Sequence, residues 1–145
     1  MTKRHSHIAA VYMILRREDG TFPMLLRQNT GYKDNEYIVP SGHVEKDEHF
    51  SDAVVRELQE EVGVSVNKDD ITLVHVSHRL VDDSDEDRLD LFYEITNWQG
   101  EVVNAEPDKC TQIGWFNEQS LPDNTYDYFK EILRFIAKGQ ILSEL

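Results

Sequence analysis

Residues 42–64 read GHVEKDEHFSDAVVRELQEEVGV, and the second half of this stretch has the pattern of an amphipathic helix. Residues 50–62 contain neither proline nor glycine, and the apolar residues Ala53, Val54, Leu58 and Val62 recur at helical spacing. Gly63 follows at once, and glycine commonly ends a helix. The sequence therefore predicts a helix over residues 50–62 with one stripe facing a core.

Three glutamates lie on a neighbouring stripe of this helix. Glu57, Glu60 and Glu61 are related as i, i+3 and i+4, which brings their Cβ atoms to about 5–6 Å from one another. They also lie in the last turn, where the negative end of the helix dipole disfavours carboxylates. A hard divalent cation would relieve both conflicts, because Mg²⁺ prefers oxygen ligands. The alternative interpretation is a solvated acidic surface, which is what most charge runs are.

The spacing across the whole stretch favours the metal site. Gly42 is followed after five residues by Glu48, and after seven more by Arg56-Glu57-Leu58; Glu60-Glu61 and Gly63-Val64 then follow at intervals of one residue. This pattern resembles the Nudix box of the Nudix (MutT-like) hydrolase family at every specified position. Other segments that look like family features are Val39-Pro40-Ser41-Gly42-His43, Trp115-Phe116 and Leu121-Pro122.

The resemblance implies a fold, a cofactor and roles for individual residues. The fold is an α/β/α sandwich with a mixed β-sheet, and the cofactor is Mg²⁺ or Mn²⁺. Glu48 and Arg56 are expected to form an ion pair that holds the preceding loop to the helix, so these two residues and Gly63 are structural. The implied metal ligands are the carbonyl of Gly42 and the side chains of Glu57, Glu60 and Glu61. The resemblance suggests Glu60 or Glu61 as the general base, with Glu106 from the loop at residues 104–112 as a further candidate.

Substrate contacts are expected from the segment before the box. Arg27 ends the second predicted strand; it is either a solvated edge charge or, as the resemblance implies, a phosphate ligand. Tyr32 and Tyr37 flank a polar loop at residues 28–35, and we expect them to be exposed aromatic side chains that stack on a base or cover the edge of the core.

The remaining segments predict one α/β domain over residues 1–145. Residues 8–17 and 22–27 read as a hairpin around a turn at Asp19-Gly20, and Ser41-Gly42 reads as a bend. Residues 71–81 and 89–96 read as long strands, residues 113–116 as a last strand, and residues 126–137 as an amphipathic helix.

Two further patterns in this part of the chain resemble metal sites. Asp83, Asp85, Asp87 and Glu94 match positions 1, 3, 5 and 12 of a calcium-binding loop. Arg88 stands where that loop needs glycine, and the flanks read as strands, so we interpret the segment as a solvated hairpin tip. His75 and His78 fall on opposite faces of their strand and cannot bind one metal ion together.

The composition restricts the class of binding partner and the cellular compartment. With 15 basic and 28 acidic residues, the formal net charge is −13, which disfavours nucleic acid polymers and anionic membranes. One cysteine, Cys110, excludes an intramolecular disulfide and a multi-cysteine zinc site, so we expect a reducing, cytoplasmic location. The apolar run at residues 8–15 continues into Arg16-Arg17 without a small-residue cleavage site, and we expect a core strand there rather than a signal peptide. The sequence is compatible with a homodimer.

These observations predict a Mg²⁺-dependent hydrolase that cleaves the diphosphate linkage of a nucleoside diphosphate bound to a further group. The favoured substrate is a (deoxy)nucleoside triphosphate, including an oxidised one, giving monophosphate and pyrophosphate. Family members specific for ADP-ribose usually carry a proline that would fall near Leu80, and there is none between Pro40 and Pro107. The alternatives are hydrolysis of ADP-ribose or a nucleotide sugar, and a non-catalytic module that senses a nucleotide.

Overall fold

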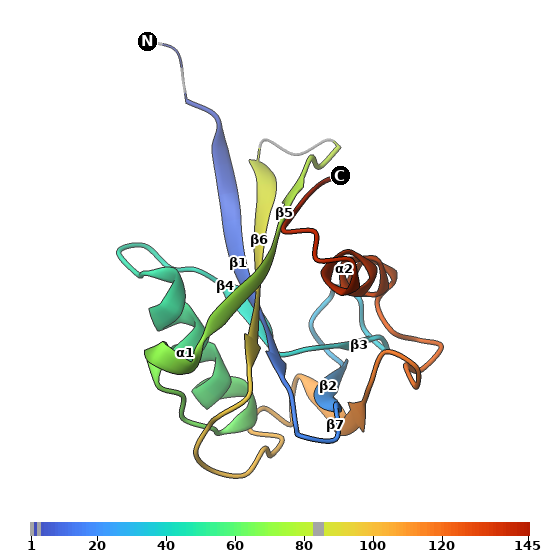
Figure 1. The fold of residues 1–145 in the computed structure, drawn as a ribbon. Helices are drawn as coiled ribbons and strands as arrows, with labels where there is room; N and C mark the ends of the chain where they lie inside the picture. The colour runs from blue at the N-terminus through green and yellow to red at the C-terminus, as the bar shows by residue number, and fades with distance from the viewer. Residues whose placement is uncertain (1, 3, 83–85) are drawn as a thin grey trace.

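Two sheets form the framework of the protein (Figure 1). The structure is a computed structural model that describes residues 2, 4–82 and 86–145. The larger sheet has the strand order β4 (Ser41–His43), β1 (Ser6–Leu15), β6 (Glu86–Ile95), β5 (Thr72–Arg79) and β8 (Leu142–Glu144). The smaller sheet has the order β3 (Tyr37–Ile38), β2 (Phe22–Arg27) and β7 (Cys110–Phe116). β1 pairs in parallel with β6 and antiparallel with β4, so the larger sheet is mixed, as predicted.

Strand β1 lies at the centre of the core because both of its faces are covered. Val11 and Met13 belong to the apolar cluster that contains the buried stripe of helix α1 (Phe50–Val62). Tyr12 and Ile14 point the other way, into the cluster that contains helix α2 (Asp127–Ala137) and much of the smaller sheet. The two helices therefore lie on opposite sides of the larger sheet, which is the predicted α/β/α sandwich (Figure 1).

The predicted helix over residues 50–62 is confirmed at both ends. Its four apolar stripe residues are fully buried, and Gly63 adopts the left-handed conformation, with φ at 71°, that glycine reaches without a steric cost. A short 3-10 helix, η1 (Lys68–Asp70), follows. Helix α2 begins one residue after the predicted start at Tyr126, which is its N-cap. No helix in the described part of the chain is long and apolar enough to cross a membrane.

The predicted hairpin of residues 8–17 and 22–27 is wrong. The turn at Asp19-Gly20 is present, and Arg17 N donates to Thr21 O at 2.8 Å. However, β1 already has a neighbour on each side, so β2 joins the other sheet between β3 and β7. The turn therefore carries the chain from one sheet to the other, and a cleft can form between the two sheets.

Other strand predictions are confirmed with shifted boundaries. β5 and β6 form the predicted antiparallel pair. Ser41-Gly42 is strand β4 instead of a bend, because its backbone pairs with β1. β7 begins at Cys110, three residues earlier than predicted. Of the rejected calcium pattern, Asp83 and Asp85 lie outside the described residues, and Glu94 accepts a hydrogen bond from Arg16 Nε at 3.1 Å.

Strand β8 was not predicted, and a buried histidine holds it in place. His75 on β5 is fully buried, and its Nδ1 donates to the carbonyl of Gln140 at 2.7 Å. Its Nε2 is then the acceptor for the hydroxyl of Ser143, at 2.8 Å. The ring also stacks on Phe135 of α2. β8 pairs in parallel with β5 through Val76, Ser77 and His78.

Candidate active site

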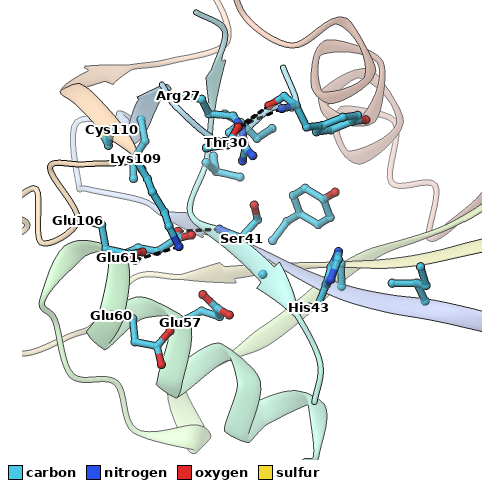
Figure 2. A pocket seen from close by; sticks show the side chains of 18 of the residues that line it. Arg27, Thr30, Ser41, His43, Glu57, Glu60, Glu61, Glu106, Lys109 and Cys110 are labelled. Atoms are coloured by element: carbon cyan, nitrogen blue, oxygen red, sulfur yellow. Dashed lines mark hydrogen bonds and ion pairs between the residues drawn. The ribbon is translucent and has the colours of Figure 1, made fainter. Parts of the chain in front are cut away.

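A cleft of about 810 Å³ lies between the two sheets and reaches the C-terminal half of α1. Carboxylates gather at one end of it: Glu57, Glu60 and Glu61 project from α1, and Glu106 comes from the loop before β7 (Figure 2). That loop is tied to the helix, because Ala105 N donates to Glu61 O at 3.1 Å. The three box glutamates and Glu106 therefore meet although about a third of the chain separates them.

Burial and like charge act against the ionised forms of the two inner glutamates. Glu61 is partly buried, and its pKa is raised well above the usual value, first by burial and then by the charge of Glu57. Burial also raises the pKa of Glu57. One compensating contact is present, because Glu61 Oε2 accepts a hydrogen bond from Ser41 N at 3.0 Å. A bound cation would lower the pKa of both glutamates.

Gly42 leaves the space in which the carboxylate of Glu57 lies. A Cβ atom on residue 42 would overlap the carboxylate carbon and an oxygen of Glu57. The close approach of strand β4 to helix α1 therefore depends on the missing side chain at residue 42. The φ of Gly42 is not in the left-handed region, so the close contact with Glu57, and not the backbone conformation, requires glycine here.

Arg56 organises the wall of the site. Its Nε and Nη2 atoms lie 2.7 and 3.0 Å from the two carboxylate oxygens of Glu48, which confirms the predicted ion pair. Nη2 also donates to the carbonyl of His43 at 3.1 Å, so loop, strand β4 and helix are joined. Nη1 lies 2.7 Å from Glu57 Oε1 and 3.4 Å from Glu60 Oε2. The guanidinium lowers the pKa of Glu48 to about 2.

The donor set fits a hard divalent cation. One arginine is shared among several carboxylates, so the cluster is not neutralised by a separate base for each glutamate. Lys109 adds a longer ion pair, with Nζ 3.7 Å from Glu106 Oε2. All side-chain ligands are oxygens, which Mg²⁺ and Mn²⁺ prefer. In the described residues these glutamates do not form a group whose ligand atoms all lie within 4.8 Å, so binding one ion requires their side chains to rotate inward.

Two of the three predicted substrate contacts line the cleft. Arg27 does so, and its Nε donates to the carbonyl of Tyr32 at 3.0 Å. Tyr32 is 55% exposed, and its hydroxyl lies 2.9 Å from that of Tyr126. The prediction that Tyr37 is an exposed aromatic is wrong. Tyr37 is buried in the smaller sheet against Phe116 and is not among the residues that line the cleft, because β3 turns that ring toward the core.

Sequence reasoning missed the basic residues at the other end of the cleft. Arg79 and Arg88 line it and converge on Asp90, whose side chain is fully buried. Arg79 Nη2 lies 2.9 Å from Asp90 Oδ2, whereas Arg88 Nη2 lies 3.7 Å from Asp90 Oδ1. The buried Nε of Arg88 has no hydrogen-bond partner among the described residues. The sequence signal that could have indicated these residues is the spacing of Arg88 and Asp90, which are two residues apart and therefore lie on one face of a strand.

Comparisons with known proteins agree with this geometry. The NUDIX domain family matches residues 6–136. A MutT NUDIX hydrolase from Burkholderia pseudomallei superposes with a TM-score of 0.78 at 23% identity, covering 89% of this chain and 97% of that chain. The MutT protein from Methanosarcina mazei gives 0.77 at 18% identity, with 94% and 97% covered. A structure described for MutT from Aliivibrio salmonicida and Vibrio cholerae gives 0.72 at 22% identity, with 92% and 98% covered.

The NUDIX domain match and the MutT-type fold support a pyrophosphohydrolase, an enzyme that acts on phosphoric anhydride bonds. The chain belongs to the Nudix domain family, whose match covers most of its length. The predicted fold class, family and enzyme class are thereby confirmed. Nudix enzymes act on small-molecule nucleotides and generally use divalent metal ions.

Proposed function

We propose that this protein is a Mg²⁺-dependent hydrolase of (deoxy)nucleoside triphosphates, oxidised ones included, that releases monophosphate and pyrophosphate. The observation that carries the proposal is the crowding of Glu57 and Glu61 in the cleft, where both have raised pKa values and Arg56 pairs with Glu57 but not with Glu61. Ionised carboxylates in such a site cost free energy when no cation is bound, and a bound cation offsets that cost. The preference for a triphosphate over ADP-ribose comes from the sequence, which has no proline near Leu80.

In this proposal Glu57, Glu60, Glu61 and the carbonyl of Gly42 hold the metal. A bound Mg²⁺ would neutralise phosphate charge and lower the pKa of the attacking water. Arg27 and Lys109, which line the same cleft, supply positive charge for phosphate oxygens. Arg56 keeps the ligand-bearing turn against β4. The general base is Glu60 or Glu61, with Glu106 as the further candidate; Glu60 is the most exposed of the three and Glu61 is held by Ser41 N.

The nucleoside would occupy the end of the cleft that Arg79 and Arg88 line. Its apolar lining includes Ile8, Ala10 and Val81, which suits a planar base. Guanidinium groups only donate hydrogen bonds, so they favour a base edge that carries carbonyl oxygens over one that carries an amino group. We therefore expect keto bases such as guanine to be preferred over adenine at this end.

A substrate panel tests the proposal. Purified protein with Mg²⁺ is given dGTP, dATP, dTTP, dCTP, 8-oxo-dGTP, ADP-ribose and a nucleotide sugar, and nucleoside monophosphate, pyrophosphate and phosphate are measured separately, because cleavage of ADP-ribose or a nucleotide sugar releases a nucleoside monophosphate without pyrophosphate. Fast pyrophosphate release from triphosphates is the expected result, and Glu61→Gln is the matched inactive control. Fast cleavage of ADP-ribose with triphosphates untouched would overturn the substrate and keep the hydrolase class. Binding without turnover of any compound would favour the nucleotide-sensing alternative.

A further inference from the structure

We propose that His5, His7, His78 and Asp87 form a second metal site, outside the cleft, that takes a borderline transition-metal ion of the Zn²⁺ type. The residues come from three neighbouring strands or their ends. His5 precedes β1 and His7 lies in it, two residues apart and therefore on one face of the sheet. Asp87 is the register partner of His7 on β6. His78 on β5 pairs with Leu89, which lies on the same face of β6 as Asp87.

The ligand atoms are already close together. One ring nitrogen each of His5 and His7 and a carboxylate oxygen of Asp87 all lie within 4.8 Å of one another. His5 Nε2 lies 2.7 Å from Asp87 Oδ2, and His7 Nε2 lies 3.0 Å from His78 Nε2. Around a tetrahedral zinc ion with bonds of about 2.0–2.1 Å, ligand atoms are about 3.3 Å apart. His5, His7 and Asp87 are therefore close to the spacing of ligands around one ion, and His78, which lies outside that group of three, must turn its ring toward them to become the fourth ligand.

Each ligand is in a state that suits coordination. Asp87 Oδ1 accepts a hydrogen bond from Val81 N at 3.1 Å, which fixes the carboxylate and leaves Oδ2 facing the histidines. When both rings are neutral, only one of the facing nitrogens of His7 and His78 carries a proton, and that ring can bind a metal ion there once the proton is carried on its Nδ1 instead.

The chemistry of the donors selects the kind of ion. Three imidazoles and one carboxylate suit Zn²⁺, Cu²⁺, Ni²⁺ or Co²⁺, whereas Mg²⁺ prefers oxygen ligands and water. The site is also separate from the cleft, because the adjacent residues Ile8 and Arg88 line the cleft and side chains alternate between the two faces of a strand. A bound ion would tie the start of β1 to the β5–β6 pair without entering the carboxylate site.

The test is a titration of metal-free full-length protein with Zn²⁺ in excess Mg²⁺, followed by calorimetry and thermal unfolding. We expect one tight Zn²⁺ site, and a melting temperature at saturating Zn²⁺ that is higher by about 4 °C or more. His7→Ala and His78→Ala should each weaken Zn²⁺ binding at least about tenfold, the usual scale for disturbing a metal site. His49→Ala, an exposed histidine outside the cluster, and Glu61→Gln should leave it unchanged.

Co²⁺ provides a second readout. Tetrahedral Co²⁺ absorbs much more strongly in the visible range than octahedral Co²⁺, so wild type and His49→Ala should show the intense band and His7→Ala should not. Hydrolysis with Mg²⁺ should be the same in His7→Ala as in wild type. The proposal is overturned if wild type binds no Zn²⁺, or if both cluster variants bind it as tightly as wild type. Loss of Zn²⁺ binding in Glu61→Gln alone would assign the ion to the cleft instead.

Discussion

Glu61→Gln should abolish most of the activity and at the same time stabilise the metal-free protein. Glutamine has nearly the same shape and can still accept the hydrogen bond from Ser41 N, so the change removes little besides one charge. That charge is disfavoured by burial and by Glu57 and Glu106. Relief of the repulsion should add up to about 1 kcal/mol to the free energy of unfolding. For a chain of this size that is a rise of about 2–4 °C in melting temperature.

Turnover of Glu61→Gln should fall, although the metal-free variant is more stable. Loss of a charged metal ligand or base should lower kcat by about 100-fold or more, which corresponds to about 2.7 kcal/mol of transition-state stabilisation. The assay compares melting with EDTA, melting with saturating Mg²⁺, and pyrophosphate release. Glu131→Gln, an exposed residue on α2 that does not line the cleft, controls for the general effect of removing a negative charge.

Addition of Mg²⁺ should stabilise wild type more than Glu61→Gln, because only wild type keeps the full ligand set. A lower melting temperature of Glu61→Gln in EDTA, together with unchanged turnover, would refute the reasoning. Glu61 would then be a structural residue whose carboxylate supports the loop around Ser41.

Three further substitutions test other parts of the site. Gly42→Ala should push the Glu57 carboxylate aside and raise the Mg²⁺ concentration for half-maximal activity at least about tenfold, as measured by metal titration of turnover; an unchanged midpoint would contradict this. Glu48→Gln should cost about 1–2 kcal/mol at pH 7 in urea unfolding. Because Arg56 lowers the folded pKa of Glu48 to about 2 from 4.5, this difference from wild type should be full above pH 4.5 and shrink as pH falls toward 2. Asp90→Asn should cost about 3–5 kcal/mol by leaving two guanidiniums without their buried counter-charge, and a loss below 1 kcal/mol would show that Asp90 does not hold them.

The box helix and its glutamates could be predicted because the information is local. Helical periodicity fixes which side chains share a face, and Gly63 marks the end of α1 within one residue. The ion pair of Glu48 and Arg56 was different. They are too far apart on one straight helix, so only the resemblance to a known family indicated that the loop folds back to bring them together.

Strand pairing and the far end of the cleft could not be predicted in the same way. A turn signal at Asp19-Gly20 predicts a reversal of the chain, but it does not say that the next strand joins a different sheet. Tyr37 looked exposed because it follows a polar loop, whereas β3 turns it inward. Arg79 and Arg88 meet only through the register of β5 and β6, in which they are direct partners. Such contacts depend on pairing across the sheet, for which one sequence contains little information.

The buried His75 also protects the edge of the larger sheet. β8 has only three residues, yet it covers the outer side of β5, whose backbone groups would otherwise be open to another chain. Exposed edges of this kind are templates for intermolecular strand pairing and aggregation. One hydrogen bond that the imidazole donates and one that it accepts keep this short strand in place. The solubility of the protein at high concentration should therefore depend on a side chain that does not line the cleft and is entirely hidden from solvent.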